Sequence, residues 1–144
     1  TQRLQHQLNL AAENGYRGKL QEQGEKLCAN LTGFFDGYRP QPSLLHGDLW
    51  GGNAACDEQG NPVIFDPACY YGDREADLAM TELFGGFDPT FYAAYRQTSP
   101  LDAGYSVRKR LYNLYHILNH LNLFGRGYLS QAENMVAALL SEVD

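Results

Sequence analysis

The sequence predicts an α+β fold that is predominantly helical and carries one small β-hairpin. Apolar residues recur at helical spacing through most of the chain, whereas residues 54–65 contain two short β-prone runs around a turn signal, EQGNP at 58–62. The chain has 144 residues, of which 44% are hydrophobic and 19% charged. A chain of this length buries about 70% of its unfolded surface, so we expect one domain with a real core.

Two helices are expected before the hairpin. Residues 1–14 repeat apolar side chains at helical spacing, and Gly15 provides a C-cap. Residues 19–38 form a second apolar stripe that Gly24 interrupts, at a cost of about 1 kcal/mol relative to alanine. The chain is therefore expected to enter the hairpin region directly from a helix.

Two further helices are expected after a loop over residues 67–72. Asp73 is a suitable N-cap for a helix over 74–84. Asp88 and the following proline then restart the chain for a short helix over 91–97.

The longest helix is predicted over residues 105–124. His116 and His120 lie four positions apart on it, a spacing that can hold zinc, but the glutamate and third ligand of a zinc protease are missing, so we favour packing or hydrogen bonding for both. Ser130 and Glu133 form a capping box for a last helix, which brings the total to about six helices around one hairpin.

The segment HGDLWGGN at residues 46–53 carries the most specific chemical signal. It matches the His-x-Asp-Leu-x-x-x-Asn pattern of a kinase catalytic loop, and Asp66 follows the hairpin where a kinase has its metal-binding aspartate. Because a hairpin returns the chain to its start, Asp66 is expected close to Asp48 and Asn53. The alternative is a chance cluster of turn residues, since aspartate often caps turns.

These residue types suit phosphoryl transfer. Such transfer needs Mg²⁺ on the phosphates of ATP and a carboxylate directed at the attacking hydroxyl. Mg²⁺ prefers oxygen ligands, which Asn53 and Asp66 supply. Asp48 is then the catalytic carboxylate that accepts the proton of the acceptor hydroxyl.

Two neighbouring residues each allow two interpretations. His46 could lie near the transferred phosphate, or it could hold the loop through a hydrogen bond, and we favour the second because buried polar groups need partners. Trp50 could pack on the loop or form a flat wall against the substrate.

Three segments, HGDLWGGN, VIFDPACYYGDREADLAMTELFGGF and LYHILNHLNLFG, resemble the fructosamine kinase family of ketosamine-3-kinases, which are relatives of aminoglycoside phosphotransferases. The resemblance covers about Pro42 to Tyr128. It implies ATP-dependent phosphorylation of a sugar hydroxyl on a small-molecule or protein-bound ketosamine. It also implies that Asp77 supports the catalytic loop by hydrogen bonds; the alternative is a helix-dipole effect of about 0.5 kcal/mol.

Charged residues near the expected cleft could recognise the substrate. Asp73, Arg74 and Glu82 could bind its amine or carboxylate, although a solvated face is the simpler interpretation of each. We retain Glu82, with Trp50, as a substrate-binding candidate.

The resemblance and the missing motifs together predict a C-terminal lobe of a protein-kinase-like fold over residues 1–144. The chain contains no glycine-rich phosphate loop and no strand lysine for ATP, so the N-terminal lobe is expected to be absent and the fragment inactive alone. The alternatives are a kinase for an aminoglycoside or amino alcohol, or a non-catalytic fragment that self-associates through its exposed inter-lobe face.

Composition limits the partners and the compartment. A net charge of −6 argues against nucleic-acid binding, and no apolar run approaches the ~20 residues of a membrane span. Three cysteines, Cys28, Cys56 and Cys69, make a disulfide framework improbable and favour buried thiols in a reducing cytoplasm.

Overall fold

The computed structural model describes residues 2–143, which divide into two compact units. The first unit comprises Thr1–Gly37 and Arg110–Asp144, and the second comprises Tyr38–Lys109. None of the described helices is both long and apolar enough to span a lipid bilayer.

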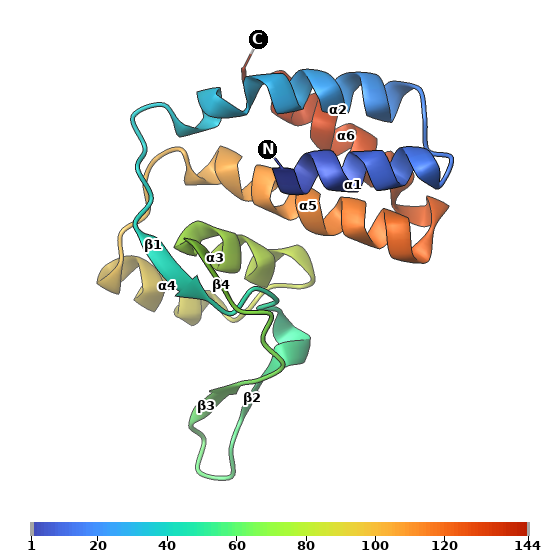
Figure 1. Ribbon diagram of the computed structural model, residues 1–144. Coiled ribbons are helices and arrows are strands. Elements are labelled where there is room, and N and C mark those ends of the chain that lie inside the picture. Colours follow the sequence, from blue (N-terminus) through green and yellow to red (C-terminus); the bar gives the residue numbers. More distant parts are fainter. Residues whose placement is uncertain (1, 144) are drawn as a thin grey trace. The chain divides into compact units, whose positions relative to one another are not determined.

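The first unit is entirely helical in its described residues. It contains α1 (Gln2–Glu13), α2 (Lys19–Asn30), a 3-10 helix (Leu31–Phe35), the larger part of α5 (Tyr105–Phe124), a second 3-10 helix (Arg126–Tyr128) and α6 (Leu129–Leu140). Figure 1 shows α2 running beside α6, with which it makes its most extensive packing.

Leucine side chains fill the core of this unit, and one glycine allows two of its helices to approach closely. A Cβ atom on Gly24 would lie 2.7 Å from a methyl carbon of Leu8, so the side chain of Leu8 occupies the space over Gly24. The glycine that weakens α2 as an isolated helix therefore serves the packing of α1 on α2.

The second unit contains two small antiparallel sheets and two helices. Its elements are β1 (Pro42–Leu45), a 3-10 turn (Gly51–Asn53), β2 (Ala54–Cys56), β3 (Pro62–Ile64), β4 (Tyr70–Asp73), α3 (Arg74–Leu83) and α4 (Pro89–Thr98), followed by the start of α5. Strands β2 and β3 form the predicted hairpin, which extends away from the β1–β4 sheet and α3 (Figure 1).

The predicted hairpin is present, but a second sheet, in which β1 pairs with β4, was not expected. Leu44 lies opposite Tyr71 and Leu45 opposite Tyr70, so the segment expected as a loop over 67–72 ends in a strand. The pairing joins residues on either side of the whole hairpin, and local sequence patterns do not report such distant partners.

Two helix boundaries also differ from the prediction. The helix expected over 19–38 ends at Asn30 and continues as the 3-10 helix. The capping box is wrong as well, since α6 begins at Leu129 and the residue at its N-cap, Tyr128, forms no side-chain cap. The preceding 3-10 helix leads directly into α6, which leaves Ser130 inside the helix.

The remaining helix signals are confirmed. The carboxylate of Asp73 accepts a hydrogen bond from the Glu75 amide, and that of Asp88 accepts one from the Thr90 amide. α5 has the expected bounds, and on it Nδ1 of His120 hydrogen-bonds the carbonyl oxygen of His116 at 2.7 Å.

The three cysteine thiols differ in exposure, so the expectation of buried thiols is wrong for Cys56 and Cys69, which are exposed. Cys28 is half-buried, and burial raises the pKa of its thiol.

Because the thiolate is the nucleophile, we expect iodoacetamide at pH 8 to alkylate Cys56 and Cys69 before Cys28. Mass spectrometry of peptides from a time course measures the order, and alkylation of Cys28 first would contradict it.

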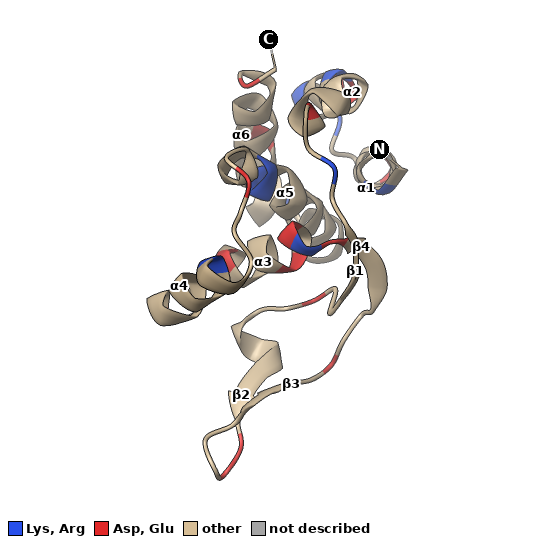
Figure 2. Ribbon diagram, turned by 90° about the vertical axis from the view of Figure 1, so that its left-hand side faces the viewer, with Lys and Arg blue, Asp and Glu red and all other residues tan. Residues whose placement is uncertain are grey.

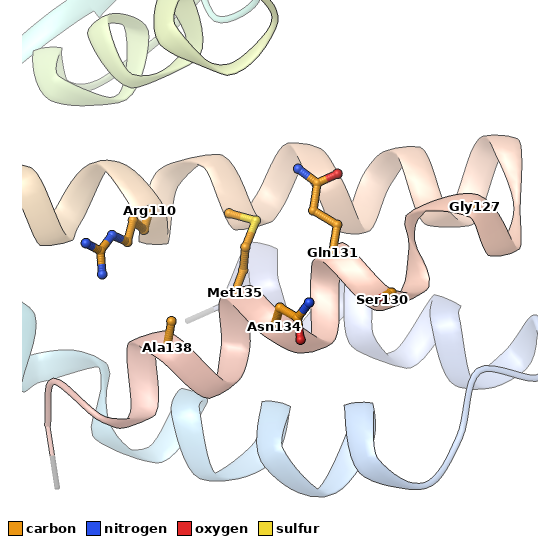
Figure 3. Close-up of a pocket in the computed structure, with 7 residues that line it drawn as sticks. All are labelled: Arg110, Gly127, Ser130, Gln131, Asn134, Met135 and Ala138. Atoms are coloured by element: carbon orange, nitrogen blue, oxygen red, sulfur yellow. The ribbon is translucent and has the colours of Figure 1, made fainter.

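An open groove lies along α6 in the first unit. It has a volume of about 540 Å³ and is lined by Arg110, Gly127, Ser130, Gln131, Asn134, Met135 and Ala138 (Figure 3). None of these is a predicted site residue, because every predicted site residue belongs to the second unit.

Candidate active site

Strand β1 leads into the start of the predicted catalytic loop, where one carboxylate fixes the backbone. The His46 amide donates to Oδ2 of Asp77 at 2.7 Å, and the Gly47 amide donates to Oδ1 at 2.9 Å. Asp77 lies in the first turn of α3, so the helix holds two successive loop amides with both oxygens of a single side chain. These are hydrogen bonds of the kind that the family resemblance implies for Asp77.

The buried imidazole of His46 connects the two sides of the site. Its Nε2 hydrogen-bonds the carbonyl oxygen of Phe65 at 2.9 Å, and its Nδ1 accepts from the Asp48 amide at 3.3 Å. Both ring nitrogens are thus engaged with the backbone, which favours the loop-holding role over a role at the phosphate.

Asn53 orients the catalytic candidate Asp48. The amide nitrogen Nδ2 of the buried Asn53 donates to the carbonyl oxygen of Asp48 at 2.9 Å and to its Oδ2 at 3.0 Å. Among the hydrogen bonds of the described residues, none uses Oδ1 of Asn53. This amide oxygen is therefore available to a ligand.

Asp66 lies between two residues whose backbone amides hydrogen-bond the segment that carries Asp48 and Asn53. The Phe65 amide donates to the Asn53 carbonyl at 3.1 Å, and the Ala68 amide donates to the His46 carbonyl at 2.8 Å. The chain on both sides of Asp66 is thereby held against the segment that carries Asp48 and Asn53. Acidic residues, red in Figure 2, occur in both chain segments that link the β1–β4 sheet to the hairpin.

Asp66 has a left-handed backbone, with φ of 58°, and is the one described non-glycine residue with positive φ. This conformation costs an ordinary L-residue roughly 1–2 kcal/mol, and only glycine, asparagine and aspartate adopt it readily. We therefore expect Asp66→Gly to stabilise the fold by about 1 kcal/mol, Asp66→Asn to leave it unchanged and Asp66→Ala to destabilise it by about 1 kcal/mol.

Urea denaturation of this series measures the free energy of unfolding. Glu58→Gly serves as the control, because Glu58 is exposed and has a negative φ, so glycine there should destabilise. Equal stability of the glycine and alanine variants at position 66 would contradict the prediction.

A glycine between the two loops allows their close contact. Gly47 has φ of 83°, and a Cβ atom there would lie 2.1 Å from the Ala68 carbonyl oxygen. Any larger residue at position 47 would separate the loop carrying Asp48 from the segment carrying Asp66.

Trp50 is partly packed and partly open. Its ring meets Phe84 edge to face, with centroids 6.2 Å apart, and a Cβ atom on Gly52 would lie 2.3 Å from the indole. The side chain is 37% exposed, so part of the indole remains accessible to a ligand. Substrate contact by Trp50 stays a prediction.

Comparison with known proteins decides the family. The sequence model of the fructosamine kinase family matches residues 1–142. The chain belongs to the fructosamine kinase family.

Individual relatives are similar over most of this chain. A probable ketoamine kinase of Vibrio vulnificus is 50% identical over 97% of this chain and 47% of its own length, and a protein-ribulosamine 3-kinase of Arabidopsis thaliana is 47% identical over 93% and 41%. The crystal structure of a candidate fructosamine-3-kinase of Thermobifida fusca superposes with a TM-score of 0.83 at 34% identity, covering 94% of this chain and 47% of that one. The chain thus spans about half the length of the relatives that it matches.

The three charged residues Asp73, Arg74 and Glu82 are half-exposed, and each also has hydrogen-bond partners within the chain. Asp73 accepts from the Tyr38 hydroxyl, and Arg74 donates to the carbonyl oxygens of Ser99 and Pro100. Glu82 accepts from the Tyr105 hydroxyl at 2.6 Å and from Nζ of Lys109 at 2.7 Å. Since both carboxylate oxygens of Glu82 already have partners, a substrate-binding role would require their displacement, and that role stays a prediction.

The donors at the site fit Mg²⁺ bound mainly through phosphates. The described residues contain no group of three His, Cys, Asp or Glu side chains that could hold a metal ion. Magnesium on a nucleotide commonly takes only one or two protein carboxylates, with phosphate and water oxygens as its other ligands. The free Oδ1 of Asn53 and the carboxylate of Asp66 supply such a limited set of hard donors.

Sequence analysis missed a buried ion pair beside the site. Glu75 and Arg108 are both buried, and they pair through two hydrogen bonds. The sequence does contain a signal for it. Arg108 precedes Leu111 by three positions, so a charged residue lies on the apolar face of α5.

Proposed function

We propose that the chain is the catalytic, substrate-binding lobe of an ATP-dependent kinase that phosphorylates a sugar hydroxyl of ketosamines. The observation that carries the proposal is the hydrogen bond from Asn53 to the Asp48 carboxylate, within a loop that backbone bonds tie to the segment of Asp66. Names of relatives as ketoamine and ribulosamine kinases support the substrate class.

Each residue has a distinct role in this proposal. Asp48 accepts the proton of the acceptor hydroxyl and directs that oxygen at the phosphate. Asn53 fixes the Asp48 carboxylate through Nδ2 and offers Oδ1, with the Asp66 carboxylate, to Mg²⁺. When bound, Mg²⁺ supplies charge compensation on the phosphates of ATP.

Residues 1–144 are proposed to need a further, N-terminal lobe for turnover. They carry the acceptor-side and metal-side groups, but no glycine-rich loop or strand lysine to hold ATP phosphates.

We also propose a reducing, cytoplasmic setting, which the free thiols at all three cysteines support.

A substrate panel tests the proposed reaction. Full-length protein is incubated with ATP, Mg²⁺ and lysine-derived fructosamine or ribulosamine, an aminoglycoside or an amino alcohol, and the phosphorylated product is identified by mass spectrometry. The proposal predicts preferential turnover of a ketosamine. Preference for the aminoglycoside or amino alcohol would replace it with the alternative acceptor class.

Self-association is a second proposal, which exposed apolar side chains in the second unit favour. Leu44, Ile64, Phe65 and Tyr71 are all among the exposed large hydrophobic residues. Exposed apolar patches of this kind promote association. Sedimentation velocity of the 144-residue chain should therefore detect oligomers that Leu44→Ser with Tyr71→Ser reduces, and a monomer at all concentrations would refute the proposal.

A further inference from the structure

A buried ion pair fixes the N-terminal turn of α3. Nε of Arg108 donates to Oε2 of Glu75 at 2.8 Å, and Nη2 donates to Oε1 at 3.0 Å. The side chains are 3% and 0% exposed, respectively. Two parallel hydrogen bonds set the orientation of both groups as well as their distance.

The pair belongs to a closed ring of contacts. The guanidinium carbon of Arg108 lies 3.6 Å from the centre of the Tyr38 ring, and the Tyr38 hydroxyl donates to Oδ1 of Asp73 at 3.1 Å. The same Oδ1 accepts from the Glu75 amide at 3.0 Å, which returns the path to the ion pair. Each member of the ring thus restrains the start of α3 from a different direction.

Arg108 is itself tightly held. Its Nη2 also donates to Oδ1 of Asp102 at 2.8 Å, and a Cβ atom on Gly104 would lie 2.4 Å from Nη1. The hydrogen bonds that Arg108 donates to the Glu75 carboxylate raise the pKa of Arg108 above its ordinary value, so the arginine remains a cation. The guanidinium is thus held by Glu75, Asp102 and the Tyr38 ring at once, and a side chain at position 104 would displace it.

The placement of this pair points to a purpose beyond stability. Replacing a buried ion pair by apolar residues of similar volume is often neutral or stabilising, so stability alone is a weak reason for it. Asp77 lies two residues after Glu75 in the same helical turn, and its two oxygens hold the His46 and Gly47 amides. A shift of that turn would misalign the Asp77 carboxylate and with it the loop that carries Asp48.

We propose that Arg108 and Glu75 are positioning residues for the catalytic loop, acting through Asp77. The description of the loop as catalytic rests on the proposed function, whereas the mechanical link from Arg108 to the Gly47 amide does not. The test therefore has one readout that is independent of activity.

The double variant Glu75→Leu/Arg108→Met removes both charges and retains side-chain volume. In full-length protein with an intact cooperative thermal transition, we expect hydrogen exchange of the His46 and Gly47 amides to accelerate about 10- to 100-fold, since the loop opens locally. We expect kcat for the ketosamine to fall by a similar factor, with both KM values changed less than about twofold. Arg108→Lys, which keeps the charge but not the paired hydrogen bonds, should give a smaller change in the same direction.

Arg110→Met is the matched control, because Arg110 lies two positions further along α5 and pairs with the partly exposed Glu142. It should leave both amides and kcat unchanged. Native protection of the His46 and Gly47 amides in folded Glu75→Leu/Arg108→Met overturns the inference; if that variant does not fold, native protection in Arg108→Lys overturns it. Absence of ketosamine turnover in the wild-type protein would instead refute the proposed function, and the exchange measurement would still decide the link.

Discussion

Asp48→Asn is expected to lower kcat about 10³-fold in the full-length protein, because general base catalysis contributes roughly 10²–10⁴-fold. The substitution removes the proton acceptor and places an amide where Nδ2 of Asn53 now donates to Oδ2. Because Asp48 is only partly buried and its backbone contacts are kept, the melting temperature should change little. Steady-state kinetics with ATP and a ketosamine measures the effect.

Asp57→Asn is the control for Asp48→Asn. Asp57 also lies in the second unit and also hydrogen-bonds an asparagine, Asn61, at 2.8 Å, but it belongs to the exposed hairpin turn. Its replacement should preserve kcat. Wild-type kcat in Asp48→Asn would remove Asp48 from the mechanism and would leave the fold assignment intact.

Asp77→Ala is expected to reduce both stability and activity. It leaves the His46 and Gly47 amides without the carboxylate that now accepts from both. Hydrogen bonds to a charged group contribute about 1.5–3 kcal/mol each, so we expect the free energy of unfolding to fall by about 3 kcal/mol and kcat by about 10²-fold. Chemical denaturation and steady-state kinetics on the same preparation give the two values.

Asp57→Ala is the matched comparison for stability, since the Asp57 carboxylate also accepts from two backbone amides, those of Gln59 and Asn61. That site is exposed, and we expect a loss of about 1 kcal/mol without loss of kcat. Comparable losses in stability and kcat for Asp77→Ala and Asp57→Ala would indicate that Asp77 has no special relation to the loop.

Local signals predicted the helices and the hairpin well. α5 has its predicted bounds because a continuous apolar stripe and flanking glycines define it, and the N-caps Asp73 and Asp88 act through residues only two positions away. The hairpin is similarly encoded, since its turn residues lie between the strands that they join.

Contacts between distant segments could not be predicted in the same way. The β1–β4 pairing depends on residues on both sides of the hairpin, and the Glu75–Arg108 pair joins two helices across 33 positions. On sequence alone Gly24 is only a weakness of α2, because its role in packing depends on Leu8 from another helix. At the site, the motif placed Asp48 and Asn53 in one loop, but the bond from His46 to Phe65 depends on how the hairpin returns.

The return of the chain after the hairpin has a mechanical consequence. Two hydrogen bonds join the loop after β1 to the segment after β3: one links Nε2 of His46 with the Phe65 carbonyl, and the other runs from the Ala68 amide to the His46 carbonyl. Gly47 allows the two segments to touch. The chain segments that carry Asp48 and Asp66 are therefore coupled, because a shift of one strains its hydrogen bonds to the other. In the proposed mechanism, the spacing between the group that accepts the proton and the group that binds the metal is thus set by the folded chain rather than by a ligand.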